Sequence, residues 1–484
     1  MDATLLSFEP DQGMSDEVYD SALKNHIAQI SRLFKDLGNE VVANAPQLLE
    51  IVNPATHSVA FLAILNTLKR LDDTGRSIPA DAFREYTLKF LLSFDPRQIR
   101  YVGDAFSDLV KDVVDCKFYP ARQAIEIVAI VLRRLDPDCA VLTSHHVAVV
   151  KMAYETDNID QVLPLVEKPW VFLPGMKDQS QPAYLCDVTA SPASYINTST
   201  HLSQKLTREE VMQHEWVTAQ IFTAKLRWAD AHKAYQRIIS WPTRDGATSK
   251  IMTDAHKRWI LTGLLTLGQT PTPPSFIAPA ATKNYASLSK LYTDIGSLFS
   301  TVNAEELKSA VEAGTPTWVD DQTTTLLKEV VKAYQKWQIL GLADVYQKIG
   351  VSEIREKTLS AETAKSLETD VETEALLQDM ISSGMLVGAL ETSPDGAKCL
   401  TFLPRDQEIE HTEYKRKITD DARIETLNKW AKASDARLMF SKDYARHIDR
   451  EAKRSQKDSS SQHVEMFETS IEDEDLMTGI QPTR

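Results

Sequence analysis

The sequence predicts a mainly α protein: a right-handed solenoid of helical repeats, then a small module of helices with a β-hairpin, then one long helix. Three observations predict this class. Apolar residues recur at spacings of three and four in successive segments up to about residue 265, which marks the buried faces of amphipathic helices. Strand patterns are almost absent before residue 385. Glycine contributes only 16 of 484 residues, which favours long helices over tight turns.

The first predicted helix covers residues 15–37. Ser15 is a suitable N-cap, and Gly38 is predicted to be the C-cap. Further helices are predicted over residues 58–71, 80–94, 99–115, 120–135, 145–156 and 158–167, and as a pair within 216–240. Amphipathic helices joined by short links bury their apolar faces by stacking on their neighbours, as TPR or HEAT repeats do. Because no strict period repeats along the chain, an irregular α-domain stays as the alternative.

Two segments interrupt the predicted array. Residues 173–204 are rich in Pro, Ser and Thr and are predicted to form an extended insertion, and residues 270–280 form a second break. Four aromatic residues are predicted to anchor the first segment to the array: Trp170, Phe172, Tyr184 and Tyr195. Three small residues are predicted where two helices approach closely: Ala224, Ala231 and Ala234.

Residues 326–404 are predicted to form a winged helix. Helices are predicted over 326–340, 342–350, 351–359 and 369–386. In the last of these, Thr369 and Glu372 have capping-box spacing and Gly384 ends the helix. Its apolar face is predicted to comprise Val371, Leu376, Met380 and Ile381. Two β-prone runs then flank Asp395-Gly396, which predicts a hairpin over residues 386–403 as the wing.

The charge of this module indicates what it contacts. A winged helix often binds DNA through its third helix, and that binding depends on cations facing phosphates. Here the third helix carries four acidic residues and no basic one, so protein is the predicted partner and nucleic acid is not. The hairpin offers an edge strand for pairing with a neighbour, and its predicted interaction residues are Leu390, Leu400 and Phe402. In the alternative, the hairpin only closes the core of its own module.

Residues 405–455 are predicted to form one long helix with a heptad seam. The predicted interaction residues of this seam are Ile424, Leu427, Leu438 and Ile448. Two seam positions are serine, so the seam is weak and needs a partner helix from this chain or another subunit. The basic polar face of the helix is either solvated or contacts acidic partner helices. Residues 456–484 are predicted to be an acidic disordered tail.

Composition and motifs argue against catalysis. The sequence has no nucleotide-binding glycine motif, no metalloprotease HExxH, no nucleophile elbow and no kinase signature, so we expect no catalytic, cofactor or metal site. The adjacent His145 and His146 are predicted on a helix surface. The four cysteines show no CxxC spacing and are predicted to be reduced core thiols. Neither a secretory signal nor a membrane span is predicted, so we expect a soluble protein of the cytoplasm and nucleus.

Residues 334–358 (YQKWQILGLADVYQKIGVSEIREKT), residues 371–392 (VETEALLQDMISSGMLVGALET) and the following hairpin resemble the PCI domain. The resemblance places a PCI domain at residues 211–404, with helical repeats to about residue 325, after N-terminal helical repeats at residues 1–210. PCI subunits build the proteasome lid, the COP9 signalosome and translation initiation factor 3. Among these complexes, residues 256–276 and 284–301 are similar to a signalosome subunit in its fungal form.

This resemblance implies a non-catalytic scaffold subunit. PCI subunits of the signalosome join their winged helices edge to edge in an open ring, and their C-terminal helices gather into a bundle. The complex removes the modifier Nedd8 from cullins with a metalloprotease in a different subunit. Expected partners are therefore the other PCI subunits, the metalloprotease-containing subunits and, through the complex, cullin-RING ligases. A PCI subunit of the proteasome lid or of the initiation factor, and a winged-helix nucleic-acid-binding protein, remain as alternatives.

Overall fold

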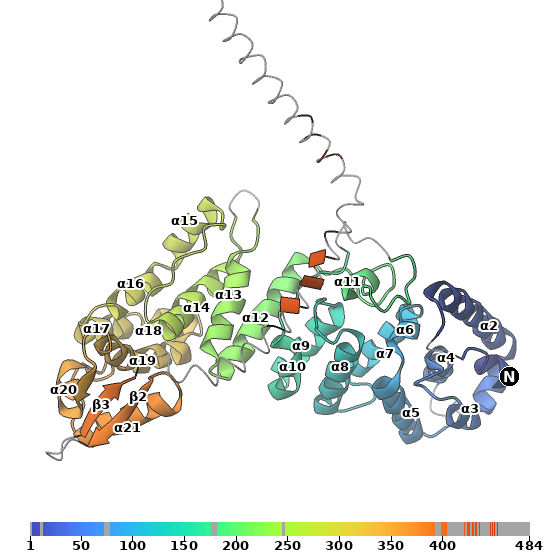
Figure 1. Ribbon diagram of the computed structural model, residues 1–484, viewed down its shortest axis with the longest axis horizontal. Coiled ribbons are helices and arrows are strands. Elements are labelled where there is room, and N and C mark those ends of the chain that lie inside the picture. Colours follow the sequence, from blue (N-terminus) through green and yellow to red (C-terminus); the bar gives the residue numbers. More distant parts are fainter. Residues whose placement is uncertain are drawn as a thin grey trace, which may run out of the picture. The chain divides into compact units, whose positions relative to one another are not determined.

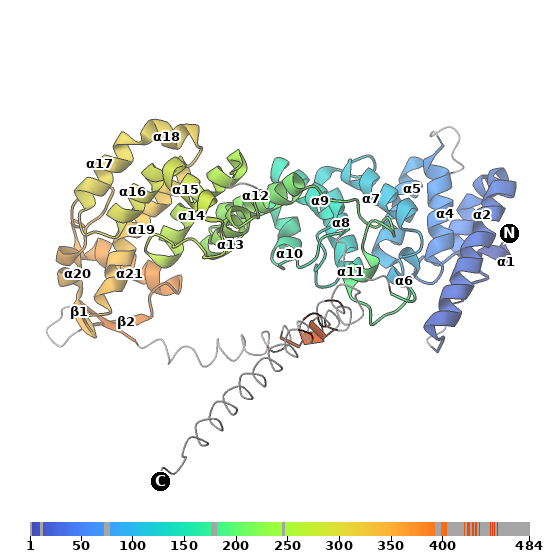
Figure 2. The same ribbon diagram turned by 90° about the horizontal axis from the view of Figure 1, so that it is seen from above.

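The computed structural model describes residues 2–9, 13–71, 78–175, 182–243, 247–392 and 398–403, together with single residues between 421 and 453. The chain divides into two units. One comprises Met1–Met176 with Gln181–Thr412, and the other comprises Lys177–Ser180 with Glu413–Arg484. The first unit contains the helices and strands below and is mainly α, as predicted (Figures 1 and 2).

The N-terminal part of the first unit consists of helices in series. Its elements are α1 (Asp2–Leu5), α2 (Asp16–Ala43), α3 (Ala45–Ile51), α4 (Ser58–Lys69), α5 (Ala80–Ser93), α6 (Pro96–Ile99), α7 (Gly103–Val114), α8 (Ala121–Leu135), α9 (Ser144–Glu155), η1 (Ile159–Val162), α10 (Leu163–Val166) and α11 (Pro192–Tyr195). The helices predicted over residues 58–71, 80–94, 120–135 and 145–156 are confirmed.

The first long helix differs from its prediction. Gly38 is not a C-cap, because α2 continues past it to Ala43. The helical geometry breaks instead at Leu37, whose φ and ψ are −122° and 24°, so the helix is kinked there. A glycine ends a helix when it adopts a left-handed conformation, and Gly38 is not among the residues with positive φ.

Two other predicted helices differ in their bounds. The helix predicted over residues 99–115 starts later, as α7, because Ile99 is the last residue of the separate short helix α6, which Asp95 caps by accepting from the Arg97 N–H at 2.9 Å. α7 begins at Gly103, where an added Cβ would lie 2.0 Å from the Thr200 carbonyl oxygen. Only glycine allows this approach of the extended segment to the helix. The helix predicted over residues 158–167 is the short pair η1 and α10.

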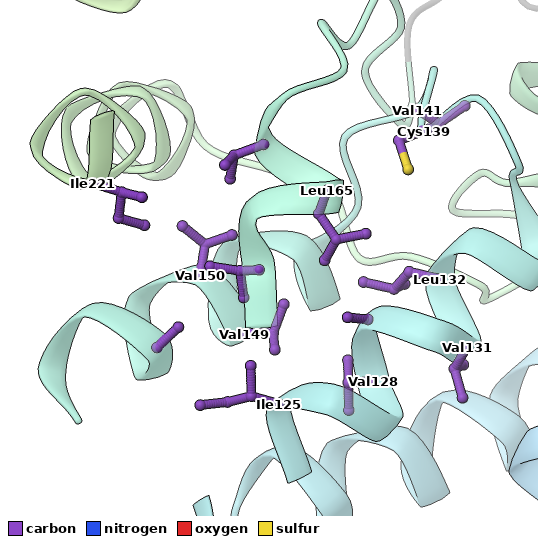
Figure 3. Close-up of a cluster of buried hydrophobic side chains, with 14 of the residues drawn as sticks. Ile125, Val128, Val131, Leu132, Cys139, Val141, Val149, Val150, Leu165 and Ile221 are labelled. Atoms are coloured by element: carbon purple, nitrogen blue, oxygen red, sulfur yellow. The ribbon is translucent and has the colours of Figure 1, made fainter. Parts of the chain in front are cut away.

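The helices pack on one another largely in chain order, which is how a solenoid buries its faces. α8 contacts α9, α9 contacts α12, α12 contacts α13 and α13 contacts α14. Figure 3 shows the core where the first of these helices meet: Val128 and Leu132 of α8 lie close to Val149 of α9 and Leu165 of α10. One continuous buried cluster runs from Leu5 to Ala361, so the array has a shared core.

The array continues with α12 (Arg208–Ala224), α13 (Trp228–Ile239), α14 (Lys250–Leu267), α15 (Pro279–Leu288), α16 (Lys290–Phe299), α17 (Ala304–Ala313) and α18 (Thr315–Asp320). The break predicted at residues 270–280 separates α14 from α15. Ala231 and Ala234 are fully buried, as expected for close-packed helices. Ala224 is exposed, so its predicted role at the helix contact is wrong, because it is the last residue of α12.

The extended segment predicted at residues 173–204 carries only α11 among its described residues. Tyr195 is buried, and its hydroxyl donates to the Leu135 carbonyl at 3.3 Å. Phe172 forms a parallel bridge with Val141, and the Trp170 indole donates to the buried Glu215 of α12. Tyr184 is half-buried against the main core. The four aromatic residues therefore contact the array as predicted.

The winged helix comprises α19 (Thr324–Leu342), β1 (Lys348–Gly350), α20 (Val351–Lys357), α21 (Asp370–Ser382), β2 (Gly388–Thr392) and β3 (Lys398–Phe402). The helix predicted over residues 342–350 is wrong, since α19 passes through Gly341 and residues 348–350 form a strand. A strand therefore occurs before residue 385. Its partner β3 lies far along the chain, so local sequence carries little signal for it.

The winged helix has a core of its own, separate from that of the array. It is formed by Ile339, Ile349, Val351, Ile354, Leu377, Met380, Leu386, Leu400 and Phe402. α21 ends as predicted, with Gly384 at a φ of +71° and its N–H donating to the Ile381 carbonyl at 3.0 Å. The domain limits at residues 210 and 404 stay predictions, although α12 begins at Arg208, close to the first of them.

The predicted C-terminal helix over residues 405–455 lies mostly outside the described residues. Those described between 421 and 453, including Ile424 and Ile448, are helical. Three residues of the basic polar face, Lys415, Arg416 and Lys417, and the predicted tail at residues 456–484 lie outside the part of the chain that the structure describes.

Candidate interaction surface of the winged-helix module

The predicted wing residues lie in a three-stranded antiparallel sheet with the order β1-β3-β2. Leu400 of β3 pairs with Ile349 of β1 on one side and with Leu390 of β2 on the other. Leu400 is fully buried, Phe402 is 8% exposed and Leu390 is half-buried against the same core. Leu400 and Phe402 therefore lie inside their own module, as the alternative interpretation of the hairpin expected, and neither offers a side chain to a partner.

The free edge of β2 is what the sheet offers to a partner. The Leu403 N–H donates to the Val387 carbonyl at 3.1 Å, which makes these two residues a hydrogen-bonded pair. Because such pairs alternate along an antiparallel ladder, the backbone N–H and C=O groups of Gly388, Leu390 and Thr392 point away from β3. No other described strand lies on that side of β2. These groups can pair with an added strand.

The outer face of the sheet is polar. Glu391 of β2 reaches across β3, where its carboxylate accepts from the Lys348 ammonium of β1 at 2.7 Å and from the Thr401 hydroxyl at 3.1 Å. This contact joins all three strands on the side opposite the core. Its partners are about half exposed, so it contributes little to stability, but it sets the charge pattern next to the free edge.

The acidic residues of α21 are largely used within the module. Asp370 pairs with Arg355 of α20 at 3.1 Å, and Asp379 pairs with Lys336 of α19 at 2.7 Å. A third contact joins Glu374 to Lys398 of β3. The acidic helix is thus bound by cations from three neighbouring elements. These pairs reduce its negative field, and they also occupy cations that phosphates would need.

The inward face of α21 differs partly from its prediction. Val371 was predicted on the apolar face, but it is 74% exposed, while Leu377 is fully buried together with Met380. The helix begins at Asp370, so Val371 lies in its first turn, before the helix reaches the core. Thr369 accepts from the Glu372 N–H at 3.3 Å as predicted, but the Glu372 carboxylate bonds to the Glu368 N–H and the capping box is not closed.

The predicted seam residues are only partly within the described residues. Ile424 and Ile448 are helical and exposed. Leu427 and Leu438 lie outside the described residues, so the seam stays a prediction.

The described side chains that could bind a metal or take part in catalysis have structural roles. Among the described residues, no group of His, Cys, Asp and Glu has the geometry of a metal site. His146 is buried, not on a surface as predicted, because its side chain forms a capping box with Thr143, with the two side chains 2.8 Å apart. Burial lowers the pKa of His146 to about 3.

The cysteines agree only in part with their prediction as core thiols. All four cysteines are free thiols; Cys139 and Cys186 are buried, Cys399 is half-buried, and Cys116 is exposed and so is not the core residue that we predicted.

In the part of the chain that the structure describes, no helix combines the length and apolar character needed to cross a membrane.

Comparison with known proteins assigns the family. Residues 21–184 match the family model of the COP9 signalosome complex subunit 3 N-terminal helical repeats. Over 98% of both chains, the sequence is 34% identical to COP9 signalosome complex subunit 3 of Neurospora crassa. It is 28% identical to the subunit of the same name from Emericella nidulans, over 72% of this chain and 71% of the relative. A relative from Dictyostelium discoideum is 21% identical over 64% of this chain and 68% of its own length. The chain belongs to the COP9 signalosome subunit 3 family.

Proposed function

We propose that this protein is a non-catalytic scaffold subunit of the COP9 signalosome, and that it supports assembly of the complex that removes Nedd8 from cullin-RING ubiquitin ligases. The observation that carries the proposal is the match to the Neurospora crassa subunit, which extends over 98% of both chains. The likeness therefore includes the helical array and the winged helix together. A metalloprotease in another subunit supplies the chemistry.

The use of buried polar groups supports a structural role. Glu215 is almost fully buried on α12 and accepts from Arg237 of α13 at 2.7 Å and from the Trp170 indole. His256 stacks on Tyr285 with ring centroids 4.6 Å apart, and its Nδ1 lies 2.9 Å from the Ser289 hydroxyl. These groups join one helix to the next, which is what a scaffold requires of its interior.

The free edge of β2 supports contact with a neighbouring PCI subunit. Strand addition uses backbone groups that every sequence provides, so specificity comes from the side chains beside the edge. Here Glu391 lies on the outer face of β2 beside this edge, and the Lys348 ammonium reaches it from β1 at 2.7 Å. The exposed apolar residues Ile424 and Ile448 support a second contact, in which the C-terminal helix joins the helices of other subunits.

Affinity purification of the tagged full chain from its host, followed by mass spectrometry, tests the proposal. The expected result is stoichiometric recovery of the other signalosome subunits, including the metalloprotease subunit. Depleting the chain should raise the fraction of cullin that carries Nedd8, measured by immunoblot. Recovery of proteasomal ATPases or of ribosomal proteins in place of signalosome subunits would overturn it.

We place the protein in the cytoplasm and the nucleus, where cullin-RING ligases act. Fluorescence microscopy of the chain tagged at its own locus measures this distribution. Confinement of the signal to one other organelle contradicts the placement.

A further inference from the structure

A groove in the first unit separates the end of the helical array from the winged helix. Its volume is 980 Å³, and its walls come from α13 and α14 on one side and from α19 and α21 on the other. α14 packs on α19 beneath it, where Gly268 lies against the Trp337 ring. No residue of β2 lines the groove, so its occupation can be measured separately from strand pairing at the wing.

Leu226, at the mouth of this groove, is the left-handed residue that ends α12, where the following Arg227 N–H donates to the Phe222 carbonyl at 2.9 Å. It follows the C-cap of α12 with a φ of 58°, a left-handed geometry that costs a non-glycine residue roughly 1–2 kcal/mol. Glycine is the usual residue at this position of a helix end. Leu226 is also 62% exposed and belongs to no buried cluster. An apolar side chain is thus held in solvent, at a backbone position that disfavours it, beside an open groove.

The inner surface of the groove is apolar and incompletely covered. Trp228 lies on α13 of the array, and Trp337 lies on α19 but packs against the core of the array. Leu340, Leu376 and Met385 pack against the core of the winged helix, and all five residues are half-buried. Together with Leu226 they form an apolar surface made from both parts of the unit. Concave apolar surfaces of this kind bind the apolar face of an amphipathic helix. The groove walls consist of helices and the loop at residues 360–367, so no strand edge is available there.

The charges around the groove are unbalanced. Lys332 pairs with Glu329 at 2.9 Å and Lys336 pairs with Asp379 at 2.7 Å, so the two lysines of the rim are neutralised. Glu362 and Glu372 also lie on the rim and are exposed. Neither forms an ion pair within 4.0 Å with any described cation. The rim therefore carries two negative charges that favour a basic occupant.

We propose that this groove is a docking site for an amphipathic helix of another protein, with large apolar side chains on one face and lysines or arginines flanking that face. Leu226 and the two tryptophans hold the apolar face, and Glu362 and Glu372 contact the basic flanks. The site goes beyond the wing edge and the C-terminal helix, because it joins the array and the winged helix to a single partner segment.

Fluorescence anisotropy with two synthetic helical peptides tests this proposal on the full chain. Both peptides carry the same leucine pattern, but one has flanking lysines and the other has flanking glutamates. We expect the lysine peptide to bind at least roughly tenfold more tightly near physiological salt. Replacing both rim carboxylates, as Glu362→Gln with Glu372→Gln, should remove most of that preference while keeping acceptor groups in place.

The variant Leu226→Gly separates binding from stability. It relieves the left-handed backbone and removes the exposed side chain, so Tm should not fall, while affinity for the lysine peptide falls by roughly tenfold. Cys116→Gly is the matched control: Cys116 has a φ of 56° at the end of α7, is exposed and lies outside the groove. It should bind the peptide as the unaltered chain does.

Three results overturn the proposal. The first is equal affinity for the two peptides, and the second is unchanged affinity in the Leu226→Gly variant. The third is self-association of the full chain in sedimentation velocity that Leu226→Gly abolishes, because the occupant would then be a second copy of this chain.

Discussion

The guanidinium of Arg100 lies 3.5 Å from the centroid of the Tyr195 ring and donates to the carbonyls of Leu185 and Asp187 at 2.9 and 2.7 Å. Arg100 is buried and directly follows α6. One side chain thus holds three points of the extended segment against the helical array. In a helix, backbone N–H groups would donate to these carbonyls. The carbonyls belong to irregular backbone here, so the Arg100 side chain supplies the donors instead.

Substituting Arg100→Lys should destabilise the chain. Both carbonyls accept from the same Arg100 nitrogen, Nη1, while the planar guanidinium lies over the Tyr195 ring. Lysine has no such plane to stack while its terminal nitrogen donates, so we expect the free energy of unfolding to fall by about 2 kcal/mol. Chemical denaturation followed by circular dichroism measures this, and limited proteolysis should show new cleavage within residues 182–204. The control is Arg122→Lys on the exposed face of α8, which should leave both measurements unchanged. Equal behaviour of the two variants would show that Arg100 does not hold the segment.

Two glycines should respond to alanine with opposite signs. At Gly268, φ is +71° and an added Cβ would lie 2.3 Å from the Trp337 ring, so Gly268→Ala should lower the free energy of unfolding by about 1–3 kcal/mol. At Gly341, inside α19, an added Cβ meets nothing within 4 Å. Gly341→Ala should therefore raise stability by about 0.5–1 kcal/mol, because alanine loses less backbone entropy in a helix. Thermal denaturation of both variants checks the signs; a shift of the same sign in both would be inconsistent with this packing.

Stability should depend on pH through buried histidines. Burial lowers the pKa of His256 to about 4, from an ordinary value of about 6.5. Between these two values the unfolded chain binds the proton and the folded chain does not. The stability that His256 contributes is therefore complete above about pH 6.5 and is lost as the pH falls towards 4. Burial lowers the pKa of His26 and His145 to about 4 as well, so their contributions have the same sign.

The variant His256→Gln isolates one part of this dependence. Glutamine does not titrate. Between pH 7 and pH 5 the variant should therefore lose less free energy of unfolding than the unaltered chain, by up to about 2 kcal/mol. Its stability at pH 7 should be lower, because the stacking on Tyr285 and Trp259 is lost. Urea denaturation at several pH values measures both effects. Parallel pH profiles for the two proteins would exclude His256 as a contributor.

The free edge of β2 can be blocked without altering its own sheet. The Thr392 N–H points away from β3, so Thr392→Pro removes an edge donor and leaves the β2–β3 ladder intact. We expect unchanged Tm and roughly tenfold weaker association with a neighbouring PCI subunit, measured by co-purification over a concentration series. Glu391→Pro is the contrasting variant, because its N–H faces β3 and its loss should destabilise the module itself. If Thr392→Pro assembles as the unaltered chain does, strand addition at β2 is not the contact.

The wing hairpin was predictable because its signal is local. The β-prone runs and Asp395-Gly396 lie within one short segment, and β2 and β3 pair where that pattern places them. The strand β1 was not predictable, because Ile349 is stabilised by pairing with Leu400, far along the chain. The burial of Leu400 and Phe402 depends on the same long-range closure, which turned two predicted contact residues into core residues.

By itself, the sequence determined the helical class, the positions of most helices, the two breaks in the array and the wing, because helix periodicity, capping and turn chemistry act over a few residues. Only the tertiary structure decided which surfaces are left open. The outward groups of β2 follow from strand order, and the groove beside Leu226 is assembled from distant segments of the chain. Whether a surface is exposed depends on which other segments of the chain pack over it. A local pattern can show that an apolar residue of a helix is buried, but it does not show which residue packs against it.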